Sequence, residues 1–154
     1  MSYSIRGLAP ADYDRLRHAS DDELARHDAV RMTADANPSF PCRVTLDDAA
    51  IGETLILVNH VSHADGPYRA SHAIFVSELA REAAHYVDEV PPALDRRILS
   101  VRAFGLDGLM TDAALAQLGE ADAVFRRMLD DPAVDHLDAH NAIRGCFAAR
   151  VERT

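Results

Sequence analysis

The sequence predicts an α+β fold, a single domain over residues 1–154 with a mainly antiparallel sheet and a few short helices. Three observations predict it. Segments that read as strands come in groups instead of alternating regularly with helices. Asp107-Gly108 lies between two such segments and is typical of an antiparallel hairpin turn. Residues 121–129 have the clearest helical period, with apolar residues at positions i, i+3, i+4, i+7 and i+8.

The first half of the chain is expected to contain strands separated by short helical segments. Pro10 opens a helical turn, and Ser20-Asp-Asp-Glu23 is a capping box for a helix that runs to about His27. The segment 54–59 is apolar on both faces, which is typical of a central strand that is covered on each side. The strands expected here cover residues 3–8, 31–36, 42–46 and 54–59.

The second half is expected to add a hairpin, one more helix and a closing pair of strands. A short helix is expected over 77–85, and Pro132 ends the helix at 121–129. A tight connection over 142–145 joins the last two strands. The strands expected in this half cover residues 68–76, 97–104, 109–112, 134–139 and 145–152.

The composition excludes several classes of function. The net charge is −9, whereas binding to nucleic acid needs a basic surface, so no nucleic-acid partner is expected. The longest strongly apolar run, Leu55–Val58, is far too short to span a bilayer. The first residues lack a signal-peptide pattern, and we expect a cytoplasmic protein without a membrane partner. Cys42 and Cys146 should then be reduced thiols, with a disulfide only if their strands lie side by side.

All 16 basic residues are arginine, and the absence of lysine excludes Schiff-base chemistry by this chain. Arginine recognises carboxylate and phosphate groups bidentately, which is one reading of this composition. Drift in nucleotide composition is the other reading, and it fits the abundance of alanine and aspartate. The sequence contains no phosphate-binding glycine loop, dinucleotide fingerprint, Gly-x-Ser-x-Gly elbow or Cys-x-x-Cys motif, so no cofactor is expected.

The segment 134–150 holds the densest group of chemically useful side chains. His136, Asp138 and His140 alternate, so on a strand they share one face, with neighbours ~6–7 Å apart. That spacing suits two ligands on one metal ion, although the outer pair would be too far apart without a bend. The alternative is a solvent-exposed strand face. A metal site would need a further ligand, for which the candidates are His60, His63 and His72.

Cys146 is a candidate nucleophile in the same segment. A thiol near His140 and Arg144 or Arg150 would favour the thiolate, because positive neighbours stabilise the anion. Alternation along the strand would place Arg150 on the same face as Cys146 and Phe147 on the opposite face. The alternative is that Cys146 is simply a small buried apolar residue.

His140 and Asn141 precede the tight connection to the last strand. His140 is a candidate general acid or base, because its side-chain type titrates near neutral pH. The turn backbone could instead satisfy its ring nitrogens. Asn141 is a candidate ligand-binding residue, or it closes the turn through its side chain.

The segment 66–72 is a second polar concentration. On a regular strand Tyr68 and His72 share one face and could protonate a ligand. Arg69 and Ser71 share the other face and could hold an anion, so both pairs cannot line one pocket. Arg102 in the hairpin is ambiguous in the same way, since it could bind a ligand or pair with an aspartate. The alternative is a core strand with local hydrogen bonds.

Several of these stretches resemble the domain-of-unknown-function family 1203. The resemblance spans about residues 30–153 and implies a small bacterial protein that consists of this domain and little else. It carries no catalytic role to any residue. The stretches that carry it are Phe40–Leu46, Pro67–Val76, Leu99–Phe104, Asp107–Met110 and His140–Arg150.

The leading hypothesis is a pocket between the 66–72 segment and the 136–150 strand pair that binds a small polar or anionic metabolite. Arginine would hold the anion, and His140 or His72 would handle protons, with or without catalysis. The second hypothesis is a binding or interaction module whose polar motifs are structural. A metal-dependent enzyme that uses His136, Asp138 and His140 is third. Homo-oligomer formation stays open.

Overall fold

The computed structural model describes residues 1–154 and contains two antiparallel sheets. The strand order is β5-β1-β9-β8-β6-β7 in the six-stranded sheet and β2-β3-β4 in the three-stranded sheet. The strands are β1 (Tyr3–Arg6), β2 (Val30–Thr33), β3 (Thr54–His63), β4 (Ala70–Ser77), β5 (His85–Val87), β6 (Leu99–Phe104), β7 (Met110–Ala116), β8 (His136–Asn141) and β9 (Phe147–Arg153). The helices are the 3₁₀ turn Pro10–Tyr13, α1 (Asp21–Arg26), α2 (Pro92–Asp95) and α3 (Ala121–Leu129). The predicted α+β class is confirmed.

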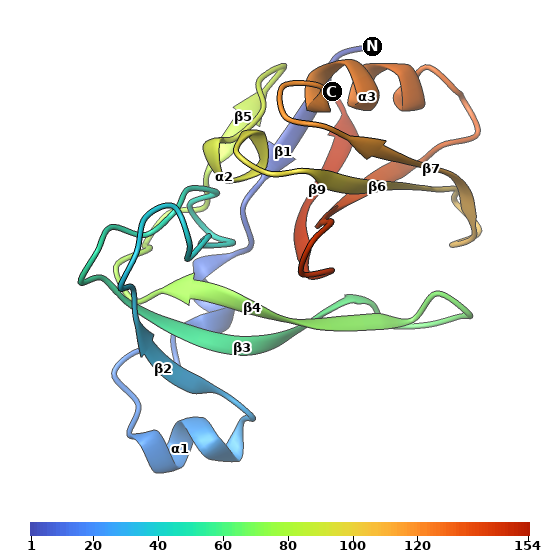
Figure 1. Cartoon of the computed structure of the whole chain (residues 1–154). Helices are drawn as coiled ribbons and strands as arrows, with labels where there is room; N and C mark the ends of the chain where they lie inside the picture. The colour runs from blue at the N-terminus through green and yellow to red at the C-terminus, as the bar shows by residue number, and fades with distance from the viewer.

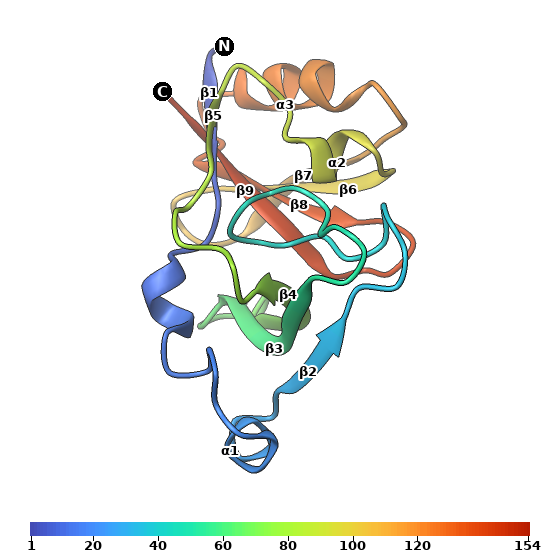
Figure 2. The ribbon, with the colours of Figure 1, turned by 90° about the vertical axis from the view of Figure 1, so that its left-hand side faces the viewer.

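The larger sheet is the middle layer of the molecule. Figures 1 and 2 show α3 on one side of it and the three-stranded sheet on the other. The predicted apolar stripe of α3 is buried against the sheet, with Phe125 and Leu129 fully enclosed. Val101, Leu137 and Val151, from three neighbouring strands, complete this core. None of the helices is long and apolar enough to cross a membrane.

The smaller sheet has a separate hydrophobic core. As predicted, β3 is its central strand, and Leu55 and Ile56 are both buried although they point to opposite faces. Leu24 of α1 packs into the same core. Ser20 caps α1 by accepting a hydrogen bond from the Glu23 backbone N–H, which is one half of the predicted capping box.

The expected strand at 42–46 is wrong. Cys42 makes one isolated bridge to β4, and the chain then turns, with Leu46 at a positive φ of 56°. Cys42 and Val44 are buried in the core of the smaller sheet, whereas Leu46 is buried in the core of the larger one. The alternating apolar pattern therefore reflects burial in two cores and not the two faces of a strand.

The expected helix at 77–85 is also wrong. Of its middle residues only Ala80 is buried, so a helix here would lack an apolar face to bury. The chain turns after β4 and continues to β5. The helical turn in this region is α2, which begins at Pro92 with a proline in the first turn, where proline fits without a lost hydrogen bond.

Candidate functional site

A layer of polar side chains lies between the two sheets. His136, Asp138 and His140 share one face of β8, as predicted, and that face looks toward the smaller sheet. His140 lies 5.1 Å from His72 of β4, measured between ring centroids. Asp138 accepts a hydrogen bond of 2.7 Å from His63 of β3. The two polar segments of the sequence therefore meet in space.

Cys146 lies in the connection before β9, and a bulge changes the expected pattern of faces. Asp138 pairs with Arg150, but His140 pairs with Phe147, so the register shifts between these pairs. Phe147 consequently shares a face with Arg150, which corrects the prediction that they oppose each other. Cys42 and Cys146 are both free thiols.

A buried arginine, Arg43, forms hydrogen bonds with the segment between β8 and β9 that contains Cys146. Arg43 is only 3% exposed and donates hydrogen bonds to the carbonyl oxygens of Phe147 (2.7 Å) and Pro41 (2.6 Å). Its third contact is with Cys146 Sγ, at 3.1 Å from Nη2. Asn141 Nδ2 lies 3.4 Å from the same sulfur atom. Burial lowers the pKa of Arg43, and the positive charge of Arg97 acts in the same direction.

His140 is neutral at pH 7. It is 2% exposed, and neither ring nitrogen has a hydrogen-bond partner. Burial lowers the pKa of His140 to about 4, and the positive charge of Arg102 acts in the same direction. The pKa of His72 is also lowered, first by burial and then by Arg102 and Arg43. Two neutral imidazoles are therefore in contact at the end of the polar layer.

A cleft of about 1000 Å³ opens beside these groups. Four arginines line it, and no aspartate or glutamate does. Arg96 and Arg97 are paired with Asp47 and Asp48 behind the lining, whereas Arg144 is exposed without a salt-bridge partner. The lining residues are Met32, Pro38, Ser39, Phe40, Pro41, Arg43, Leu57, Ser71, His72, Ala73, Phe75, Arg96, Arg97, Ile98, Leu118, Asn141, Ile143, Arg144 and Cys146.

The cleft brings together four of the predicted site residues. They are His72, Asn141, Arg144 and Cys146, and His140 lies directly behind His72. Sequence reasoning missed Arg43, Arg96 and Arg97. The signal for Arg43 was available, because it is a single arginine between the apolar residues Cys42 and Val44.

The other predicted residues lie outside the cleft. Tyr68 and Arg69 are in the turn before β4 and are exposed, and the Tyr68 ring packs edge-on against Phe104. Arg102 is half-buried on β6 opposite Asp138. Arg150 donates two hydrogen bonds to Asp138, at 2.8 and 3.0 Å. Arg150 and Asp138 thus belong to a second polar cluster, around His63.

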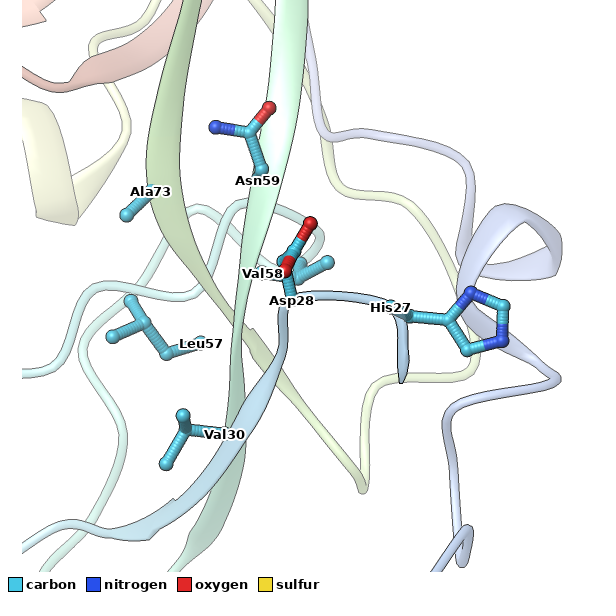
Figure 3. Close-up of a pocket in the computed structure, with 7 residues that line it drawn as sticks. All are labelled: His27, Asp28, Val30, Leu57, Val58, Asn59 and Ala73. Atoms are coloured by element: carbon cyan, nitrogen blue, oxygen red, sulfur yellow. The ribbon is translucent and has the colours of Figure 1, made fainter. Parts of the chain in front are cut away.

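A smaller pocket of about 310 Å³ lies beside β2, β3 and β4 (Figure 3). Its walls include Val30, Leu57 and Ala73, and Asp28 contributes the one carboxylate. The ring of His27 points away from the other side chains, so the pocket has no converging polar groups (Figure 3). This pocket is not a candidate site.

The fold and the cleft define an α+β protein with two antiparallel sheets and an arginine-lined cleft. The family model described as Protein of unknown function (DUF1203) matches residues 39–153. The chain belongs to this family. The comparison with curated proteins and the comparison with solved structures give no match.

Proposed function

We propose that the protein binds a small organic anion in the cleft between the two sheets. The observation that carries the proposal is the charge of the cleft lining, which contains four arginines and no carboxylate although the whole chain has a net charge of −9. Two of these arginines, Arg96 and Arg97, are paired with aspartates, so Arg43 and Arg144 supply the uncompensated charge. Arginine groups form bidentate hydrogen bonds with carboxylate and phosphate. A cavity that concentrates them in an acidic protein favours an anion.

The remaining lining suits a ligand with an apolar body. Phe40, Phe75 and Ile98 supply apolar surface, and small-molecule sites combine such surface with a few polar groups that fix orientation. Arg144 would contact the anionic group, because its guanidinium has no competing carboxylate. Asn141 Oδ1 is buried without a hydrogen-bond partner and would accept one from the ligand.

Two side chains that line the cleft, His72 and Cys146, could take part in a reaction of the ligand. His72 is neutral at pH 7 and can accept a proton from a bound acid, with His140 behind it. The Cys146 sulfur is held by Arg43 and Asn141 and lines the same cleft. We propose a cytoplasmic location, where the free thiols Cys42 and Cys146 would stay reduced.

Binding can be tested with a panel of four anions: inorganic phosphate, citrate, benzoate and phenyl phosphate. We expect isothermal titration calorimetry to detect at least one of them, with weaker binding at higher salt. Arg144→Ala should weaken that binding at least tenfold, since a hydrogen bond to a charged group contributes about 1.5–3 kcal/mol. The matched control is Arg127→Ala, which removes an exposed arginine of α3.

Two results would contradict this proposal. One is a panel in which no anion binds. The other is equal binding by the Arg144 and Arg127 variants, which would leave the alternative of an interaction module whose polar residues are structural. The melting temperature should not change in Arg144→Ala, because Arg144 makes no side-chain hydrogen bond that its loss would break.

A further inference from the structure

Three side chains of metal-ligating type meet at the His136 end of β8. His63, His136 and Asp138 each offer one ligand atom, and these atoms all lie within 4.8 Å of one another. None of the three lines the arginine cleft. Together they form a separate site with two imidazole nitrogens and one carboxylate. His63 takes the place that the sequence assigned to His140, which faces His72 instead.

The orientation of His136 leaves a lone pair inside this cluster. His136 Nδ1 lies 2.8 Å from Asp135 Oδ2, and because a carboxylate only accepts, Nδ1 carries the hydrogen atom. In the neutral ring Nε2 is then an acceptor. This atom is buried without a hydrogen-bond partner and lies 4.0 Å from Asp138 Oδ1, which is another acceptor. A cation between these two atoms would give His136 Nε2 a partner and would use a second lone pair of Asp138 Oδ1, which already accepts a hydrogen bond from Arg150 Nε.

His63 completes the ligand set from the other sheet. Its Nε2 donates a hydrogen bond of 2.7 Å to Asp138 Oδ2. The His63 and His136 rings are stacked, with centroids 5.7 Å apart and an angle of 27° between planes. Phe104 packs against both rings and fixes their position. A bound ion would replace the hydrogen atom on His63 Nε2.

The surroundings of the cluster have the features of an outer coordination shell. Asp138 is 0% exposed, and two hydrogen bonds from Arg150 fix the plane of its carboxylate. A carboxylate bonded to the far nitrogen of a histidine, as Asp135 is to His136, commonly orients metal-binding histidines. Asp135, Asp138 and Glu152 all lie close enough to Arg150 to raise its pKa, so three carboxylates are available to offset the charge of a dication.

We propose that His63, His136 and Asp138 bind a divalent transition-metal ion such as Zn²⁺, Co²⁺ or Fe²⁺. Two imidazoles and one carboxylate suit these ions and leave an open position for water or another ligand. Ligand atoms around a tetrahedral zinc ion are about 3.3 Å apart. The 2.7 Å contact between His63 Nε2 and Asp138 Oδ2 must therefore lengthen by less than 1 Å, and the wider pairs of ligand atoms, which all lie within 4.8 Å of one another, must draw together. The histidine side chains are 13% and 12% exposed, which gives an ion access.

The test uses the full chain purified without a histidine tag and stripped with EDTA. Titration with ZnCl₂ by calorimetry, and with CoCl₂ by visible absorption, should give one ion per chain. His63→Gln and His136→Gln should each weaken binding at least 100-fold. His27→Gln, which changes an exposed histidine after α1, is the matched control and should bind as the unaltered chain does.

A gentler variant tests the orientation of His136. Asp135 is exposed, so Asp135→Asn should keep the metal-free melting temperature and weaken zinc binding 10–100-fold. The proposal is overturned if neither ion binds, if more than one ion binds per chain with equal strength, or if both histidine variants bind zinc normally. An Asp135→Asn variant that folds and binds zinc at full strength would also overturn it.

Discussion

Acidification below pH 6.5 should destabilise the fold through His140. The unfolded chain binds a proton at this side chain near its ordinary pKa of 6.5, whereas burial lowers the pKa in the folded protein to about 4. The unfolded state therefore binds more protons between these two values. The stabilisation is fully present above pH 6.5 and is lost as the pH falls toward 4.

The size of the effect follows from the two pKa values of His140. With pKa values of 6.5 in the unfolded chain and about 4 in the folded protein, the free energy of unfolding falls by about 3 kcal/mol by pH 4. At pH 5 the loss is about 2 kcal/mol. The pKa values of His60 and His72 are also lowered by burial, so their contributions have the same sign. The pKa of Asp138 lies below its ordinary 3.8, so protonation of this carboxylate changes the stability only at a lower pH than protonation of the histidines does. The window from pH 7 to 5 thus isolates the histidines.

The assay is urea denaturation at pH 7, 6 and 5, followed by far-UV circular dichroism. His140→Phe removes the titration and breaks no hydrogen bond, because neither ring nitrogen has a partner. We expect this variant to lose about 2 kcal/mol less than the unaltered chain between pH 7 and pH 5. His140→Gln should behave in the same way and serves if the phenylalanine variant does not fold. His27→Phe, which changes an exposed histidine, is the matched control for the substitution.

The reasoning is refuted if the His140 variants and the unaltered chain have the same pH dependence. Equal slopes would mean that His140 binds a proton equally well in the folded and unfolded states. That result would contradict its burial between His72 and Phe147.

Three further substitutions test the fold by thermal or urea denaturation. Gly7→Ala should cost about 3 kcal/mol or more, since its Cβ would collide with the Val44 backbone carbonyl; a loss under 1 kcal/mol would contradict this close approach. Leu137→Ala should cost about 3 kcal/mol because the side chain is fully buried in the core under α3, and an unchanged urea midpoint would count against that core. Ser20→Ala should cost about 1 kcal/mol through loss of the α1 cap, and Ser20→Asp, which can also cap, should restore it.

Local patterns in the sequence predicted several parts of the fold and the site. The Asp107-Gly108 turn joins β6 and β7, and the apolar period of residues 121–129 coincides with α3. Alternation placed His136, Asp138 and His140 on one face, because side chains on a strand alternate whatever the strand packs against. These predictions succeeded because each depends on neighbours within a few residues.

The sequence named His60, His63 and His72 as candidate partners of these residues but could not choose among them, since the choice depends on contacts between distant segments. His63 comes to Asp138 from a strand 75 residues earlier in the chain. Arg43 reaches Cys146 across 103 residues, from a segment whose apolar pattern indicated a strand. The bulge that turns Phe147 toward the smaller sheet leaves no local signal, because no glycine or proline marks it.

The polar layer is not what holds either sheet together. Each sheet has its own hydrophobic core, and these cores form two separate clusters on either side of the layer. An ion pair that buries one partner completely, as Asp138–Arg150 does, is often no more stable than apolar side chains of similar volume, and the unpartnered nitrogens of His140 add a further cost. An apolar replacement such as His140→Phe should therefore be tolerated by the fold. The fold alone thus gives no reason for histidines, arginines and Asp138 at this interface, whereas binding of an anion and of a metal ion would give one.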